Sequence, residues 1–131
     1  MSVEKTYLSE RDKKILHNII EELKQDKGIL AAILFGSVLK SNVYNDIDLA
    51  IVRTPNSASK SLKYLLQFPL KFDAHFLTEM PIIIAKEAIK GELLFNKDYS
   101  QLFDIYIKII KEWESFRPYY DLYLETVKNG I

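Results

Sequence analysis

Two stretches close together in the chain decide its fold: Ile29-Leu-Ala-Ala-Ile-Leu-Phe-Gly36-Ser37 and Asp46-Ile-Asp48-Leu-Ala-Ile-Val52. The first is a continuous apolar run that ends in a glycine-serine turn, which predicts a strand buried on both faces. The second predicts a strand whose side chains alternate, so Asp46 and Asp48 share one face while the apolar residues between and after them face the core. Two carboxylates side by side repel each other unless a cation lies between them. These stretches therefore predict a cation site beside a turn.

The turn itself has two readings. Gly36 and Ser37, at the end of a buried strand, can offer backbone N–H groups and a hydroxyl to a phosphate. A glycine-serine pair is also common in ordinary turns, and Asp-x-Asp is also found on solvated faces of sheets. The two motifs together, in this order, favour a metal-dependent enzyme that acts on a nucleotide.

A third acid lies in Lys71-Phe-Asp-Ala-His-Phe-Leu77, which predicts another strand with alternating apolar residues facing inward. Asp73 then faces the other way, and it joins Asp46 and Asp48 if the two strands are neighbours. His75 shares the face of Asp73, where it either lines the acceptor side of a cleft or caps the strand edge. As a zinc ligand His75 has no companions.

The order Gly36-Ser37, Asp46-x-Asp48 and a later Asp73 resembles the DNA polymerase β-like nucleotidyltransferase superfamily. At this length the chain is most similar to the minimal nucleotidyltransferases (MNT), short proteins often paired with a HEPN-domain partner. The resemblance runs over about residues 29–95. It implies an α/β (α+β) fold: a small mixed sheet of about four strands with flanking helices and a long C-terminal helix.

Carried over by position, the resemblance implies that Gly36 and Ser37 hold the triphosphate of ATP. It makes Asp46, Asp48 and Asp73 the catalytic and metal-binding acids, and hard carboxylate oxygens suit Mg²⁺ or Mn²⁺.

The loop after the first strand departs from the family pattern. Family members commonly read Gly-Ser-x-Ala-Arg-Gly, whereas this chain reads Gly36-Ser-Val-Leu-Lys-Ser-Asn42. The arginine and the second glycine are missing. Lys40 is the candidate for supplying the positive charge to the nucleotide, as a point charge rather than a bidentate fork.

For short members paired with a HEPN toxin, the resemblance implies transfer of AMP from ATP to a tyrosine of the toxin. The chain is then the antitoxin of a toxin–antitoxin pair. Two alternatives stay open: an antitoxin with a weak or inactive site that neutralises its partner by binding alone, and a small-molecule nucleotidyltransferase. The altered loop favours the first alternative, and the complete set of three acids opposes it.

Composition narrows the class of protein. The chain has 131 residues, 48% of them hydrophobic and 27% charged, as expected of one globular domain over residues 1–131, with a core over about 29–95 and a helical extension over about 98–128. Its 18 basic and 18 acidic side chains balance, which argues against bulk binding of nucleic acid. Cysteine is absent, so disulfides and thiolate sites are excluded. Without a signal region or a membrane-length apolar run, we expect a cytoplasmic protein.

Helix signals flank the strands. Ser9-Glu-Arg-Asp12 predicts a capping box at the start of a helix that ends at Gly28. A short helix is expected between about Ser59 and Phe68. A further helix is expected to begin with Thr78 as its N-cap and to end at Gly91.

The C-terminal third predicts the longest helix. Seven apolar or aromatic residues form a stripe that is expected to cover the sheet: Tyr99, Leu102, Phe103, Tyr106, Ile109, Ile110 and Trp113. Pro118 is expected to break this helix and to start a second helical piece. The aromatic residues around the break are typical of a protein interface, with a HEPN-domain toxin or a second copy of the chain as partner: Phe116, Tyr119, Tyr120 and Tyr123.

Overall fold

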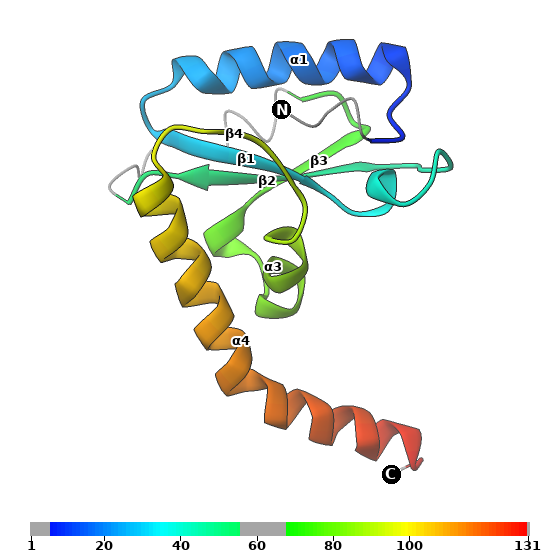
Figure 1. The fold of residues 1–131 in the computed structure, drawn as a ribbon. Helices are drawn as coiled ribbons and strands as arrows, with labels where there is room; N and C mark the ends of the chain where they lie inside the picture. Colours follow the sequence, from blue (N-terminus) through cyan, green and yellow to red (C-terminus); the bar gives the residue numbers. More distant parts are fainter. Residues whose placement is uncertain (1–5, 56–67, 131) are drawn as a thin grey trace.

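A computed structural model of the chain describes residues 6–55 and 68–130. Within them a four-stranded sheet has the order β3-β2-β1-β4, and Figure 1 shows helices on both sides of it. The strands are β1 (Ile29–Phe35), β2 (Ile47–Arg53), β3 (Phe72–Phe76) and β4 (Glu92–Asn96). β1 pairs antiparallel with β2 and β4, and β2 pairs parallel with β3. The predicted mixed sheet is confirmed.

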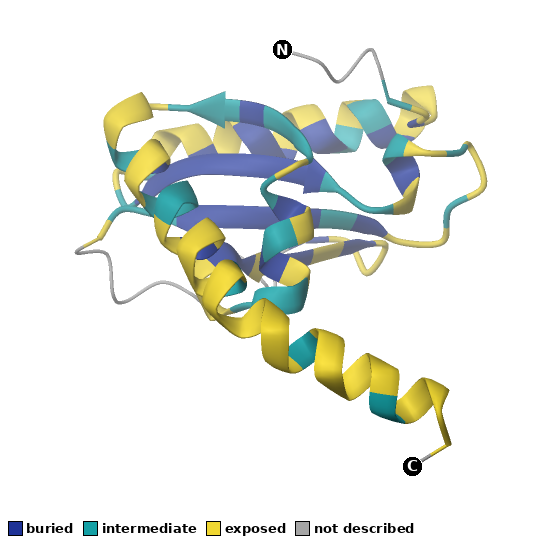
Figure 2. Ribbon diagram, turned by 60° about the horizontal axis from the view of Figure 1, so that its bottom comes forward, coloured by how far each residue is buried: buried dark blue, intermediate teal, exposed yellow. Residues whose placement is uncertain are grey.

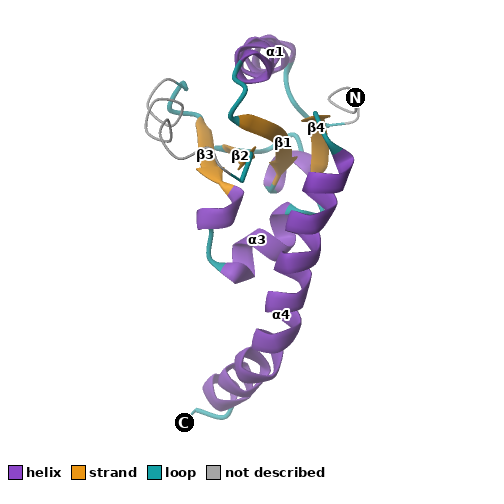
Figure 3. Ribbon diagram, turned by 90° about the vertical axis from the view of Figure 1, so that its left-hand side faces the viewer, coloured by secondary structure: helices purple, strands orange, loops and turns teal. Residues whose placement is uncertain are grey.

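Helix α1 (Glu10–Gln25) covers one face of the sheet. Helix α3 (Ile82–Ala88) and the first half of α4 (Tyr99–Lys128) cover the other, as Figure 3 shows. The central strand β1 is buried along nearly its whole length, as its continuous apolar sequence predicts.

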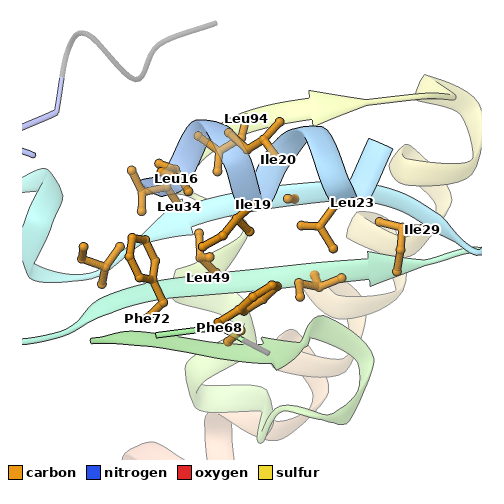
Figure 4. Packing of buried hydrophobic residues seen from close by; sticks show 14 of the residues in the cluster. Leu16, Ile19, Ile20, Leu23, Ile29, Leu34, Leu49, Phe68, Phe72 and Leu94 are labelled. Carbon is orange, nitrogen blue, oxygen red and sulfur yellow. The ribbon is translucent and has the colours of Figure 1, made fainter. Parts of the chain in front are cut away.

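Two apolar clusters hold these layers together. Under α1, Leu16, Ile20 and Leu23 pack against inward-facing residues of the strands, which Figure 4 shows from close by. Beneath α3 and α4 the cluster includes Ala50 and Val52 of β2. From Leu49 to Val52, strand β2 is therefore apolar on both faces, and the acids lie at its start.

The start of α1 differs from the predicted capping box in one bond. The Asp12 N–H donates to Ser9 Oγ at 3.2 Å, as the motif predicts. The Ser9 N–H donates to the Tyr44 hydroxyl at 2.9 Å instead of to the Asp12 carboxylate. That carboxylate accepts hydrogen bonds from Tyr44 and Lys71.

Two helix predictions need comment. Thr78 is not an N-cap: it lies inside the short 3₁₀ helix η3 (Leu77–Glu79), and α3 begins after Pro81, whose fixed φ suits a helix start. The helix expected between about Ser59 and Phe68 lies, except for Phe68, outside the described residues.

Helix α4 runs without interruption through Pro118, so the predicted break is wrong. A proline removes one backbone hydrogen bond and bends a helix when the surrounding turns persist. Figure 1 shows α4 changing direction along its length.

The predicted stripe on α4 covers the sheet only in part. Leu102 and Ile109 are buried, whereas Tyr99, Phe103 and Ile110 are exposed. Beyond Trp113 the helix extends away from the body and is mostly exposed (Figure 2). Across residues 6–55 and 68–130, no helix combines the length and apolar character that a membrane span needs.

Candidate active site

The structure brings two of the three predicted acids together across adjacent strands. Asp48 of β2 lies opposite Asp73 of β3 in the parallel ladder. Their neighbours Leu49 and Ala74 belong to the core under α1, so both acids occupy the face on the side of α3 and α4. Asp46 lies directly before β2 and is exposed.

Gly36 lies directly against Asp48. Its backbone has φ +89° and ψ −157°, a region that is essentially restricted to glycine. A Cβ atom at this position would collide with Oδ2 of Asp48. The last residue of β1, Phe35, pairs with Asp48 in the ladder, which sets this close approach. The glycine is therefore required by the packing of the carboxylate, in addition to any role at a phosphate.

Asp48 is electrostatically strained. Burial raises the pKa of Asp48 above its ordinary value of 3.8, the charges of Asp73 and Asp46 raise it further, and His75 opposes them. A bound cation would remove this cost by pairing with the crowded negative charge. The donor set is all hard oxygen, which fits Mg²⁺ or Mn²⁺.

These acids do not form a closed cage. In the part of the chain that the structure describes, no group of three or more acidic, histidine or cysteine side chains is already gathered to hold a metal ion. Mg²⁺ usually keeps open positions for substrate phosphates and water and binds through one or two carboxylates. The arrangement fits an ion that arrives with a nucleotide.

His75 is coupled to the acids rather than placed apart from them. Its Nε2 lies 2.8 Å from Oδ1 of Asp73, and both side chains are about half exposed. When the imidazole is protonated, this contact is an ion pair that orients the Asp73 carboxylate toward one side.

The glycine-serine turn continues into the short 3₁₀ helix η2 (Ser37–Leu39). The N–H groups of Leu39, Lys40 and Ser41 donate to the carbonyls of Gly36 and Ser37. These N–H groups are therefore used inside the turn, so a phosphate would have to contact the start of the turn or the exposed residue Ser37 instead.

A hollow of about 290 Å³ lies beside this turn. Its lining comprises Phe35, Gly36, Leu39, Lys40, Glu87, Lys90 and Gly91. Lys40 therefore lies beside Gly36, and Lys90, 3.9 Å from Glu87, is a second cation in this hollow that the sequence did not single out. A Cβ on Gly91 would collide with the Leu34 carbonyl, so this glycine lets the connection after α3 pass close to β1 and brings Lys90 to the turn. The sequence did carry one signal for Lys90, because this residue stands next to Gly91, directly before strand β4.

The predicted interface residues lie on the second half of α4. Trp113 contacts the rings of Phe116 and Tyr120, at 6.1 and 5.6 Å between centroids. Tyr119 and Tyr123 are exposed. The prediction that they bind a partner is untested by the structure.

Comparison with known proteins identifies the family. The profile of the polymerase beta nucleotidyltransferase family matches residues 17–100, which include the turn and all three acids. The chain belongs to this family. No curated protein is similar enough to the chain to be matched.

Solved structures share the fold. A tri-AMPylated Shewanella oneidensis HEPN toxin in complex with an MNT antitoxin is similar with a TM-score of 0.62 and 16% identity, over 88% of this chain and 98% of that one. A toxin–antitoxin MntA–HepT structure gives a TM-score of 0.64 and 14% identity, over 88% and 98%. A toxin–antitoxin structure with AMP-PNP gives 0.64 and 15%, over 85% and 97%.

Proposed function

We propose that this chain is a metal-dependent nucleotidyltransferase that transfers AMP from ATP to a tyrosine of a HEPN-domain toxin, as the antitoxin of the pair. The observation that carries the proposal is the pairing of Asp48 with Asp73 against Gly36. The tri-AMPylated toxin in one similar complex and the AMP-PNP in another support the choice of ATP and of a protein acceptor.

Asp46, Asp48 and Asp73 would hold Mg²⁺ or Mn²⁺, which supplies charge neutralisation for the triphosphate and lowers the pKa of the attacking hydroxyl. The exposed Ser37 hydroxyl and the cations Lys40 and Lys90 border the place where the phosphates would lie. Positioning and charge stabilisation are the main demands of phosphoryl-type transfer.

The reaction needs one base. The acceptor hydroxyl oxygen forms a bond to the α-phosphorus of ATP, the bond from that phosphorus to the bridging oxygen breaks, and pyrophosphate leaves. Asp73 would accept the proton of the hydroxyl, and His75, at 2.8 Å from it, would orient the carboxylate.

The second half of α4 is the proposed docking surface for the toxin. Leu102 and Ile109 are packed on the body, and Phe116 and Tyr123 continue the same seven-residue spacing where the helix is uncovered. Exposed aromatic rings on a single helix face are the usual anchors of helix-mediated interfaces.

A contact-only antitoxin is the second candidate. The exposed face of α4 favours it, because that surface can bind a partner without the acids. The loop without the family's arginine also favours it.

Intact-mass spectrometry of the partner tests the proposal. A HEPN-domain toxin that forms a complex with this chain is incubated with it, ATP and Mg²⁺, and a gain of one or more AMP units is expected. Asp73→Asn should keep the complex and abolish the gain. A complex without any mass gain in the parent protein would favour the contact-only antitoxin.

A further inference from the structure

Asp12 is a buried carboxylate that the proposed reaction does not use. It lies in the first turn of α1 and is 3% exposed. Carboxylates are rarely buried this completely unless charged or polar groups pair with them. Asp12 Oδ2 accepts hydrogen bonds from the Tyr44 hydroxyl at 2.8 Å and from Lys71 Nζ at 2.9 Å.

The three side chains form one connected network. The Tyr44 hydroxyl also accepts a hydrogen bond from the Ser9 N–H, so this hydroxyl is engaged both as a donor and as an acceptor. The Lys71 ammonium lies 5.0 Å from the centre of the Tyr44 ring, within the range of a cation–π contact. Burial alone raises the pKa of Asp12, but hydrogen bonds from Lys71, Tyr44 and Ser9 outweigh it and the pKa is lowered. The carboxylate is thus ionised and satisfied at neutral pH.

The partners of Asp12 stand at matching places in the chain. Tyr44 lies two residues before Asp46, and Lys71 lies two residues before Asp73. A backbone hydrogen bond also joins the two segments, because the Ile47 N–H donates to the Lys71 carbonyl at 2.8 Å. The network therefore fastens both acid-bearing strands to α1 just before their acids.

The network does not touch the acids. Asp48 and Asp73 face α3 and α4, whereas α1 covers the opposite face of the sheet. Any influence of Asp12 on a metal ion must therefore pass through the strand ends. Such an influence matters here because the charges of Asp46, Asp48 and Asp73 crowd one another.

We infer that Asp12, Tyr44 and Lys71 position the acid-bearing ends of β2 and β3 for metal binding, so that Asp12 and Tyr44 are positioning residues of the active site. This inference rests on the proposed function. Removing a group that hydrogen-bonds directly to a metal ligand commonly lowers metal affinity by about 10–100-fold, so an effect passed on through the strand ends should lie near the lower end of that range.

Tyr44→Phe is the variant of choice. It removes one hydroxyl and changes no charge, so a change in cation affinity cannot come from altered Coulomb attraction. Asp12→Asn is the second variant. Mn²⁺ binding to the full chain, followed by electron paramagnetic resonance, should weaken about tenfold in Tyr44→Phe.

The opposite end of β2 offers a matched control. Arg53 closes that end through an ion pair of 2.5 Å with Glu79, which follows β3. Replacing both partners, Arg53→Gln with Glu79→Gln, therefore loosens the same two strands at the end away from the acids without changing the net charge. This double variant should leave the Mn²⁺ affinity unchanged, even where its urea midpoint falls as much as that of Tyr44→Phe.

The outcomes separate the two claims. If the parent binds Mn²⁺ and Tyr44→Phe binds it equally well, the network only stabilises the fold and the inference is overturned. Equal weakening in the Arg53→Gln, Glu79→Gln variant overturns it too, because any loosening of the strands would then suffice. If the parent itself binds no Mn²⁺, with or without ATP, the proposed function fails first and the inference with it.

Discussion

The two halves of α4 carry the same sequence pattern but bury it differently. Residues at seven-residue intervals lie on one face, because seven residues make nearly two helical turns: Leu102, Ile109, Phe116 and Tyr123. The first two are 3% and 7% exposed, and the last two are 36% and 62% exposed. The pattern predicts which face is apolar, while burial depends on whether α3 and the sheet reach that far.

Strand β2 repeats the contrast within seven residues. Ala50 and Val52 are buried beneath α3 and α4, whereas Asp48, on the same face, is half-buried and Asp46 is exposed. In both elements the covered part maintains the fold. The uncovered part is where a ligand or a partner can bind, so substitutions should affect stability on one side of this division and binding on the other.

The largest effect is expected in the covered half of α4. Leu102→Ala should lower the free energy of unfolding by about 2–5 kcal/mol, because it leaves a cavity in the core. Tyr123→Ala, on the same helix face, should change it by no more than about 0.5 kcal/mol. Urea denaturation with a common m-value measures both. Similar losses at both positions would show that the second half of α4 packs on the body in solution.

The uncovered half should show the reverse behaviour. Tyr119→Ala and Tyr123→Ala should each weaken binding of the HEPN-domain partner by about 2 kcal/mol or more, if they are anchors, without a change in urea midpoint. Tyr99→Ala is the control, since Tyr99 is as exposed as Tyr119 but lies at the start of the same helix. Titration calorimetry gives the affinities. If Tyr99→Ala weakened partner binding as much as the other two variants, the docking surface would not be confined to the second half of α4.

Local pattern was enough to predict the strands and the face of its strand on which each acid lies. The alternation of side chains placed Asp48 and Asp73 on matching faces of their strands. The two acids lie opposite each other because β2 and β3 are also neighbours in the sheet. Pro118 was misread because a proline's local cost does not decide whether the turns on either side persist.

Contacts between distant segments could not be predicted from sequence. The capping-box motif gave Asp12 a local partner, but its carboxylate pairs with residues 32 and 59 positions away. Lys90 likewise reaches the turn only because α3 returns to β1. In each case the deciding neighbour is set by packing of the whole sheet, which no local motif encodes.

A smaller effect is expected at the turn. If the Ser37 hydroxyl binds phosphate, Ser37→Ala should weaken ATP binding by about 1.5–3 kcal/mol, the strength of a hydrogen bond to a charged group. Ser41→Ala is the control in the same loop, because its hydroxyl accepts the Val43 N–H within the loop. Titration calorimetry in Mg²⁺ measures both variants. Equal losses would assign the effect to loop folding, and no loss would leave Gly36-Ser37 as an ordinary turn.

The smallest effect concerns the stability of the metal-free protein. The pKa of Asp48 is raised above 3.8 in the folded chain, by burial and by Asp73 and Asp46. As pH rises from 3.8 to that raised pKa, the folded state holds more protons than the unfolded state, so stability falls across this window and the loss persists above it. Asp48→Asn removes the charge and should raise Tm at pH 7 in EDTA, with the difference shrinking as the pH approaches 3.8.

With Mg²⁺ and ATP added, the parent should become more stable than Asp48→Asn. The parent gains about 2.7 kcal/mol at a ligand concentration of 100 times Kd, and Asp48→Asn should gain little because a ligand of the ion is lost. Scanning calorimetry at several pH values, with and without Mg²⁺ and ATP, follows both effects. A lower Tm for Asp48→Asn in EDTA at pH 7 would mean that the carboxylate supports the fold. The burial and charge repulsion at Asp48 would then not lower the stability of the metal-free protein, and they would give no support to a metal site there.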